Sequence, residues 1–171
     1  MFTASSLNGN KAEQYAQLAE QARALLAGER DRVANAANLS ALVYHALPDL
    51  NWVGFYFYDG RELVVGPFQG LPACVRIPLD RGVCGAAARS GQTQRVEDVH
   101  AVPDHIACDA ASRSELVVPL FAPDASGNDA LLGVFDLDSP VPARFDVEDQ
   151  RGLESIAREF VASLDSANGN G

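Results

Sequence analysis

The sequence predicts an α+β fold: a mostly antiparallel sheet with the N- and C-terminal helices packed on one face. Two observations lead to this class. Apolar residues recur at helical spacing near both ends of the 171-residue chain, and the middle carries short aromatic and β-branched runs separated by turn signals. Helices that flank hairpin-forming strands are typical of a sheet with its helices gathered on one side. We expect one domain over 1–171, with a helical segment at 11–47, a core at 51–164 and a frayed tail at 165–171.

Two helices are expected in the N-terminal segment. Residues 11–26 are rich in Ala, Leu, Glu and Gln, and Gly28 follows them as a stop signal. A second helix is expected from about Asp31 to Ala46. It should end before Pro48, because the residue before a proline is disfavoured in a helix.

A hairpin should follow, because aromatic and β-branched runs at 51–58 and 62–68 flank Asp59-Gly60. The next elements are expected to be short. They are a strand at 73–79, an Ala-rich helix opened by Gly82 and closed by Gly91, and a strand at 93–99.

The stretch 100–114 is predicted to be a functional loop, because long irregular loops in compact domains usually carry function and this one is poor in Gly. A second hairpin is expected from 115–122 and 130–140 around an exposed turn. The last helix is predicted over Val147–Leu164, with Asp146 as its N-cap.

Composition excludes several classes of protein. A net charge of −10 argues against a nucleic-acid partner, which needs clustered Lys and Arg. No apolar stretch approaches the roughly 18 to 20 residues of a membrane helix, and the first residues carry no secretory signal, so a cytoplasmic protein with no membrane partner is expected. Three cysteines, an odd number, predict free thiols or redox chemistry rather than a disulfide framework.

The cysteines are Cys74, Cys84 and Cys108, and their spacing matches neither a zinc site nor a Cys-x-x-Cys motif. Spacing alone favours three packing residues. Context favours chemistry for two of them. Cys84 lies at an expected helix N-terminus, which lowers a thiol pKa, and Cys108 lies in the polar loop three residues after His105. Cys74 alternates with apolar residues and is the best candidate for a structural thiol.

Three acids are expected to meet near this loop. Glu115 opens one strand of the second hairpin, and Asp136 and Asp138 close the other on a shared face. Acids at strand ends are often only solvated termini. Convergence beside a cysteine loop also suggests a binding or catalytic cluster, and the two interpretations stay open at this point.

The segments "NWVGFY", "VVGPFQGLPACVRI", "RGVCGAAA", "HIACDAASRSELVVPL" and "LDSP…FDVEDQ" resemble, in order and spacing, the free methionine-(R)-sulfoxide reductases, which are stand-alone GAF-domain enzymes. The resemblance implies a GAF fold and thiol-based reduction of free L-methionine-(R)-S-oxide to methionine, with thioredoxin as the reductant. It implies no cofactor and no metal. A homodimer is left open.

The resemblance also implies residue roles. Cys108 matches the nucleophile that becomes a sulfenic acid, Cys84 the resolving thiol and Cys74 a third, less essential thiol. Which of Cys84 and Cys74 resolves the sulfenic acid stays open. The acids at 115, 136 and 138 match residues that bind the substrate and polarise its S–O bond. The matching aromatic residues near the substrate methyl group are Trp52 and Tyr56.

Two other functions fit the same residues. One is a GAF module that binds a small ligand and signals without catalysis. The other is a cysteine redox sensor, in which the disulfide itself is the signal. The three acids favour the reductase function over these two alternatives. Oxygen is a poor leaving group from sulfur unless it is protonated, and clustered acids in a pocket raise one another's pKa, which keeps a proton donor available.

Overall fold

The computed structural model describes residues 2–101, 110–124 and 126–164. The predicted α+β class is confirmed. Four helices, one 3₁₀ turn and six strands follow in the order α1 (Lys11–Leu26), α2 (Arg32–Ala46), β1 (Trp52–Tyr58), β2 (Leu63–Gly70), β3 (Arg76–Ile77), α3 (Gly82–Ser90), β4 (Gln94–Val96), η1 (Val99–Ala101), β5 (Ser114–Pro123), β6 (Asp129–Ser139) and α4 (Val147–Leu164).

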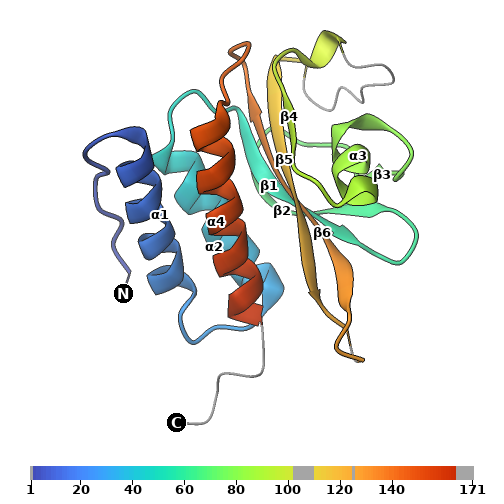
Figure 1. Ribbon diagram of the computed structural model, residues 1–171, viewed down its shortest axis with the longest axis horizontal. Coiled ribbons are helices and arrows are strands. Elements are labelled where there is room, and N and C mark those ends of the chain that lie inside the picture. Colours follow the sequence, from blue (N-terminus) through green and yellow to red (C-terminus); the bar gives the residue numbers. More distant parts are fainter. Residues whose placement is uncertain (1, 102–109, 125, 165–171) are drawn as a thin grey trace.

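The six strands form one sheet in the order β3-β2-β1-β6-β5-β4, and every neighbouring pair is antiparallel. Helices α1, α2 and α4 cover one face, and α3 lies on the other (Figure 1). The long hairpin β5–β6 and strand β1 form the centre of the sheet. Terminal helices on one face were predicted, and the layered arrangement confirms it.

Alternation along the central strands divides the core into two parts. In β1, Val53, Phe55 and Phe57 belong to the large cluster under α1, α2 and α4, whereas Trp52 and Tyr56 belong to the smaller cluster under α3. Successive side chains of a strand point to opposite faces, so this division follows from the register alone. The face under α3 is the one that also carries polar residues.

Two predicted strands are shorter in the structure. The strand expected at 73–79 spans only Arg76–Ile77, which pair with the first two residues of β2, and the one expected at 93–99 spans Gln94–Val96. Pro78 ends β3, since proline has no N–H to donate to a ladder. Both short strands are sheet edges. The loop residues 102–109 and the tail 165–171 lie outside the described residues.

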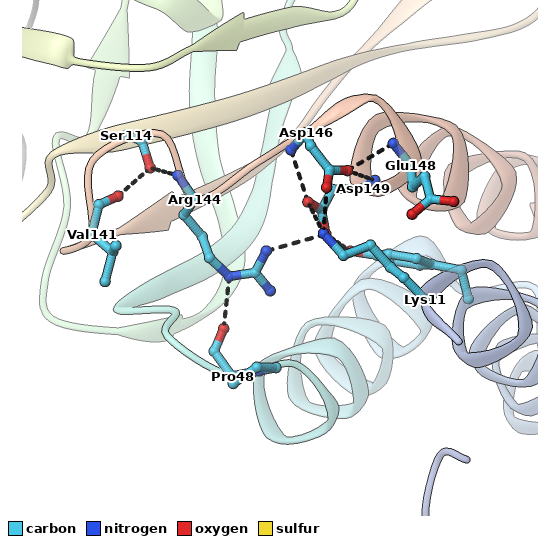
Figure 2. Close-up of polar contacts among 9 residues, drawn as sticks. Lys11, Pro48, Ser114, Val141, Arg144, Asp146, Glu148 and Asp149 are labelled. Carbon is cyan, nitrogen blue, oxygen red and sulfur yellow. Dashed lines mark hydrogen bonds and ion pairs between the residues drawn. The ribbon is translucent and has the colours of Figure 1, made fainter. Parts of the chain in front are cut away.

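A buried carboxylate joins α1 to the start of α4. Asp149, 1% exposed, accepts hydrogen bonds from the Tyr15 hydroxyl at 2.7 Å and from Lys11 Nζ at 2.9 Å. It also accepts one from Arg144 Nη1 at 3.1 Å. The side chains of Lys11 and Arg144 therefore both contact Asp149 at this end of α4 (Figure 2). Asp146 caps α4 as predicted, since its Oδ1 accepts from the backbone N–H groups of Glu148 and Asp149.

The same region fixes the start of β5. The buried Ser114 hydroxyl donates to the Val141 carbonyl at 2.6 Å and accepts from the Arg144 N–H at 3.3 Å (Figure 2). Ser114 therefore ties β5 to the loop that follows β6. Because Glu115 is the next residue, this anchor also sets where its side chain enters the opposite face.

Candidate active site

A cavity lies on the face of the sheet covered by α3. Strand alternation directs five predicted site residues there: two aromatics from β1, one acid from β5 and two acids from β6. Cys84 comes from the first turn of α3. The cavity is lined by Trp52, Tyr56, Leu71, Pro72, Ala73, Ile77, Gly82, Val83, Cys84, Ser112, Glu115, Asp136 and Asp138. The structure thus brings six of the eight predicted site residues around one cavity.

The Cys84 thiol faces the buried acids. Its Sγ lies 3.4 Å from Oδ2 of Asp136 and 3.9 Å from Oε1 of Glu115. Burial, followed by the charges of these carboxylates, raises the pKa of Cys84 well above its usual range. The sequence led us to expect a lower pKa from the helix N-terminus. That expectation is wrong, because burial and two acids outweigh the helix dipole.

Asp136 is the most enclosed of the three acids that line the cavity. Burial, followed by the charge of Glu115, raises its pKa well above the usual value. Its Oδ1 is buried and has no hydrogen-bond partner in the described part of the chain. A buried acceptor without a partner is costly, so this oxygen indicates a place for a ligand or a shared proton.

Glu115 and Asp138 are direct cross-strand partners in the β5–β6 ladder. Glu115 is buried and Asp138 is half-buried, so the acids form a gradient from the interior toward the opening of the cavity. Like charges directly opposite each other are destabilising. The described residues that line the cavity include no lysine or arginine. The arrangement therefore favours a proton or a cationic ligand.

The aromatic wall is larger than the sequence indicated. Trp52 stacks on Tyr56 at a ring-centroid distance of 5.7 Å, and on Phe68 of β2 at 5.1 Å. Phe68 was not among the predicted site residues, although its cross-strand pairing follows from the predicted β1–β2 hairpin. The indole Nε1 of Trp52 is buried without a hydrogen-bond partner among the described residues. It supplies an available donor in the wall of an acidic cavity.

Ser112 was also missed, because it precedes β5 in what the sequence presented as loop. It is buried, lines the cavity, and its Oγ accepts a hydrogen bond from Asn51 Nδ2 at 3.0 Å. A small polar residue just before an acidic strand start was the available signal. Ser112 links the end of the 100–114 stretch to the entry of β1.

The remaining cysteines differ from Cys84. Cys74 is disulfide-bonded, whereas Cys84 is a free, buried thiol. Cys108 and His105 lie outside the described residues. Cys74 is only partly buried and packs against the cluster under α3, close in sequence to the cavity residues Pro72 and Ala73.

A six-stranded antiparallel sheet with three helices on one face, and a fourth helix over a polar cavity on the other, has the architecture of a GAF domain. A model of the GAF domain family matches residues 13–164. The free methionine-R-sulfoxide reductase of Escherichia coli is 51% identical over 91% of this chain and 89% of its own length. That of Saccharomyces cerevisiae is 41% identical over 90% and 87%.

A solved structure gives the same result. The X-ray structure of the free methionine-R-sulfoxide reductase of Neisseria meningitidis in complex with its substrate superposes with a TM-score of 0.87. It is 43% identical in sequence, and the match covers 96% of each chain. The chain belongs to the free methionine-R-sulfoxide reductases of the GAF family. The resemblance seen in the sequence is confirmed. In the described part of the chain, no helix has the length and apolar character needed to span a bilayer.

Proposed function

We propose that this protein reduces free L-methionine-(R)-S-oxide to methionine. The observation that carries the proposal is the acidic cavity under α3, where Glu115 and Asp136 are buried beside each other and Asp136 Oδ1 has no partner in the described structure. Similarity to reductases over most of the chain supports the same activity.

Each group has a task in the proposed reaction. The Glu115–Asp136 pair donates a proton to the sulfoxide oxygen, because the raised pKa of Asp136 keeps an acid available near neutral pH. Asp138, nearer the opening, pairs with the ammonium group of the free amino acid. Trp52 and Tyr56 form the wall for the methyl group. A methionine within a peptide lacks that ammonium, which accounts for a preference for the free substrate.

The sulfur chemistry balances without a metal or organic cofactor. The Cys108 thiolate attacks the sulfoxide sulfur, and the sulfoxide oxygen is transferred to the cysteine together with a proton. Methionine is released, and Cys108 becomes a sulfenic acid. A second thiol attacks that sulfenic sulfur, water leaves, and a disulfide forms. A dithiol reductant of the thioredoxin class restores both thiols, as expected in a reducing cytoplasm.

We assign the resolving role to Cys74, because it is disulfide-bonded while Cys84 is a free thiol. The sequence resemblance implied Cys84 instead, and that remains the alternative. On our assignment, Cys84 holds the Asp136 carboxyl in position by donating a hydrogen bond to its Oδ2.

A coupled assay tests the function. Thioredoxin, its reductase and NADPH are supplied with the R or the S epimer of free methionine sulfoxide, and with a peptide-bound sulfoxide. NADPH should be consumed only with the free R epimer, and Cys108→Ser should abolish consumption. Tight binding without turnover would favour a sensory GAF module. Disulfide formation with peroxide but not with sulfoxide would favour a redox sensor.

A further inference from the structure

The cavity contains three side chains of the kinds that hold soft divalent cations. A ligand atom from each of Cys84, Glu115 and Asp136 lies within 4.8 Å of the others. All three side chains are more than nine-tenths buried. They come from α3, β5 and β6, so the rigid core rather than a loop fixes their positions.

The distances suit a tetrahedral ion. A zinc ion about 2.3 Å from sulfur and about 2.0 Å from oxygen requires sulfur–oxygen separations of about 3.5 Å. The observed separations from Cys84 Sγ are 3.4 Å to Asp136 and 3.9 Å to Glu115. Both sulfur–oxygen separations are therefore within a few tenths of an ångström of the value that such an ion requires. The fourth position would face the cavity and hold water.

A second observation points to a ligand at this place. Asp136 Oδ1 is a buried acceptor that has no hydrogen-bond partner among the described residues, and the residue lines the cavity. The described lining residues include three acids and neither lysine nor arginine, a lining whose side chains are suited to a cation. The cavity volume of about 30 Å³ is enough for one ion with a water.

We propose that Cys84, Glu115 and Asp136 form an inhibitory site for a thiophilic divalent cation, Zn²⁺ or Cd²⁺. A thiolate ligand selects these ions over Mg²⁺ and Ca²⁺, which prefer oxygen ligands. The bound ion occupies the acids that the reaction needs, so it competes with methionine sulfoxide. Inhibition rests on the proposed function, whereas metal binding does not.

Cadmium titration of the isolated protein tests the site directly, since a cadmium thiolate absorbs in the ultraviolet. The variant with Cys74→Ser and Cys108→Ser keeps Cys84 as its only thiol. We expect one Cd²⁺ per chain and the thiolate band in this variant, with Zn²⁺ displacing Cd²⁺. Absence of the band there would overturn the proposal.

Cys84→Ser in the otherwise unchanged chain should lose the band. Its affinity for Zn²⁺, measured against a chromogenic chelator, should fall by more than the ~10- to 100-fold lost with an outer-shell partner of a metal ligand. Retention of the band would overturn the proposal. Asp136→Asn provides an independent test if the serine variant does not fold, and it should weaken Zn²⁺ binding similarly.

Activity is measured separately, so the two proposals fail in different ways. Reductase assays with a chelator present report the proposed function without metal. Zn²⁺ added to the active enzyme should then raise the apparent KM for methionine sulfoxide and leave kcat unchanged. Inhibition that substrate does not relieve would overturn the competitive site.

Discussion

The Cys84 thiol lies 3.4 Å from Oδ2 of Asp136, and both side chains are buried. Burial raises the pKa of each group. The charge of Asp136 raises the pKa of Cys84 further, whereas the hydrogen bond from Cys84 lowers the pKa of Asp136 in part. The site is therefore built to hold protons rather than to expose a reactive thiolate at position 84. We therefore expect the acid pair, rather than a thiolate at position 84, to take part in proton transfer.

Asp136→Asn should lower kcat/KM by about 10²- to 10⁴-fold, the usual contribution of a general acid. Wild-type activity needs the protonated pair, so it should fall as pH rises through the raised pKa of Asp136. A pH–rate profile checks this. If the variant kept wild-type activity and the same fall in activity at alkaline pH, the role of this acid would be contradicted.

The same substitution should alter stability in a defined direction. The folded pKa of Asp136 is raised above the unfolded value, so its contribution to stability is present at low pH and is lost as pH rises through the folded pKa. Asparagine does not titrate, so Asp136→Asn should not lose stability as pH rises in this way. Urea unfolding at several pH values should therefore show the variant gaining on the wild type as pH increases. Parallel curves would show that the carboxyl does not titrate with folding.

Cys74→Ser and Cys84→Ser should separate the two candidates for the resolving thiol. After one equivalent of sulfoxide, Cys74→Ser should accumulate a sulfenic acid that dimedone traps, whereas Cys84→Ser should still form a disulfide. Peptide mass mapping measures both outcomes. The reverse pattern would restore Cys84 as the resolving residue. Cys84→Ser should also turn over more slowly, since it removes the contact with Asp136.

Asp149→Asn should destabilise the protein by about 3–5 kcal/mol, because it leaves Arg144 without its carboxylate in a buried setting. Asp146→Asn is the matched control. Asp146 is half-exposed, pairs with the same Lys11, and asparagine still caps a helix, so the cost should be below about 1 kcal/mol. Chemical denaturation measures both values. Equal losses would show that burial of Asp149 is not decisive.

Val75→Asp should weaken the interaction with thioredoxin. Val75 is 64% exposed and follows the disulfide-bonded Cys74, so it is placed to contact a reductant that attacks this bond. Loss of one apolar anchor worth 1–2 kcal/mol would raise the KM for thioredoxin by about 5- to 30-fold. Turnover supported by dithiothreitol should stay unchanged. Val33→Asp, an exposed apolar site on α2, is the control and should alter neither rate.

The local pattern determined much of the fold. The family resemblance pointed to Trp52 and Tyr56, and alternation in β1 accounts for their shared face. Asp146 was identifiable as a cap from its place before an acidic turn. The edge strands β3 and β4 were overpredicted, because edge pairing depends on how much of a neighbouring strand is free. Ser112 and Phe68 carried no distinctive motif. Ser112 was found because it lines the cavity, and Phe68 because it stacks on Trp52.

By itself the sequence determined the fold class, the family and the set of thiols and acids, because periodicity and motif spacing are local properties of a chain. Tertiary structure decided which of those groups meet and in what state. The position of Cys84 at a helix start suggests a reactive thiol with a lowered pKa. Burial and packing against Glu115 and Asp136 instead raise the pKa of that thiol. The electrostatic environment of Cys84 depends on neighbouring residues from β5 and β6 as well as on its own helix α3. No single segment of the sequence contains all of these residues.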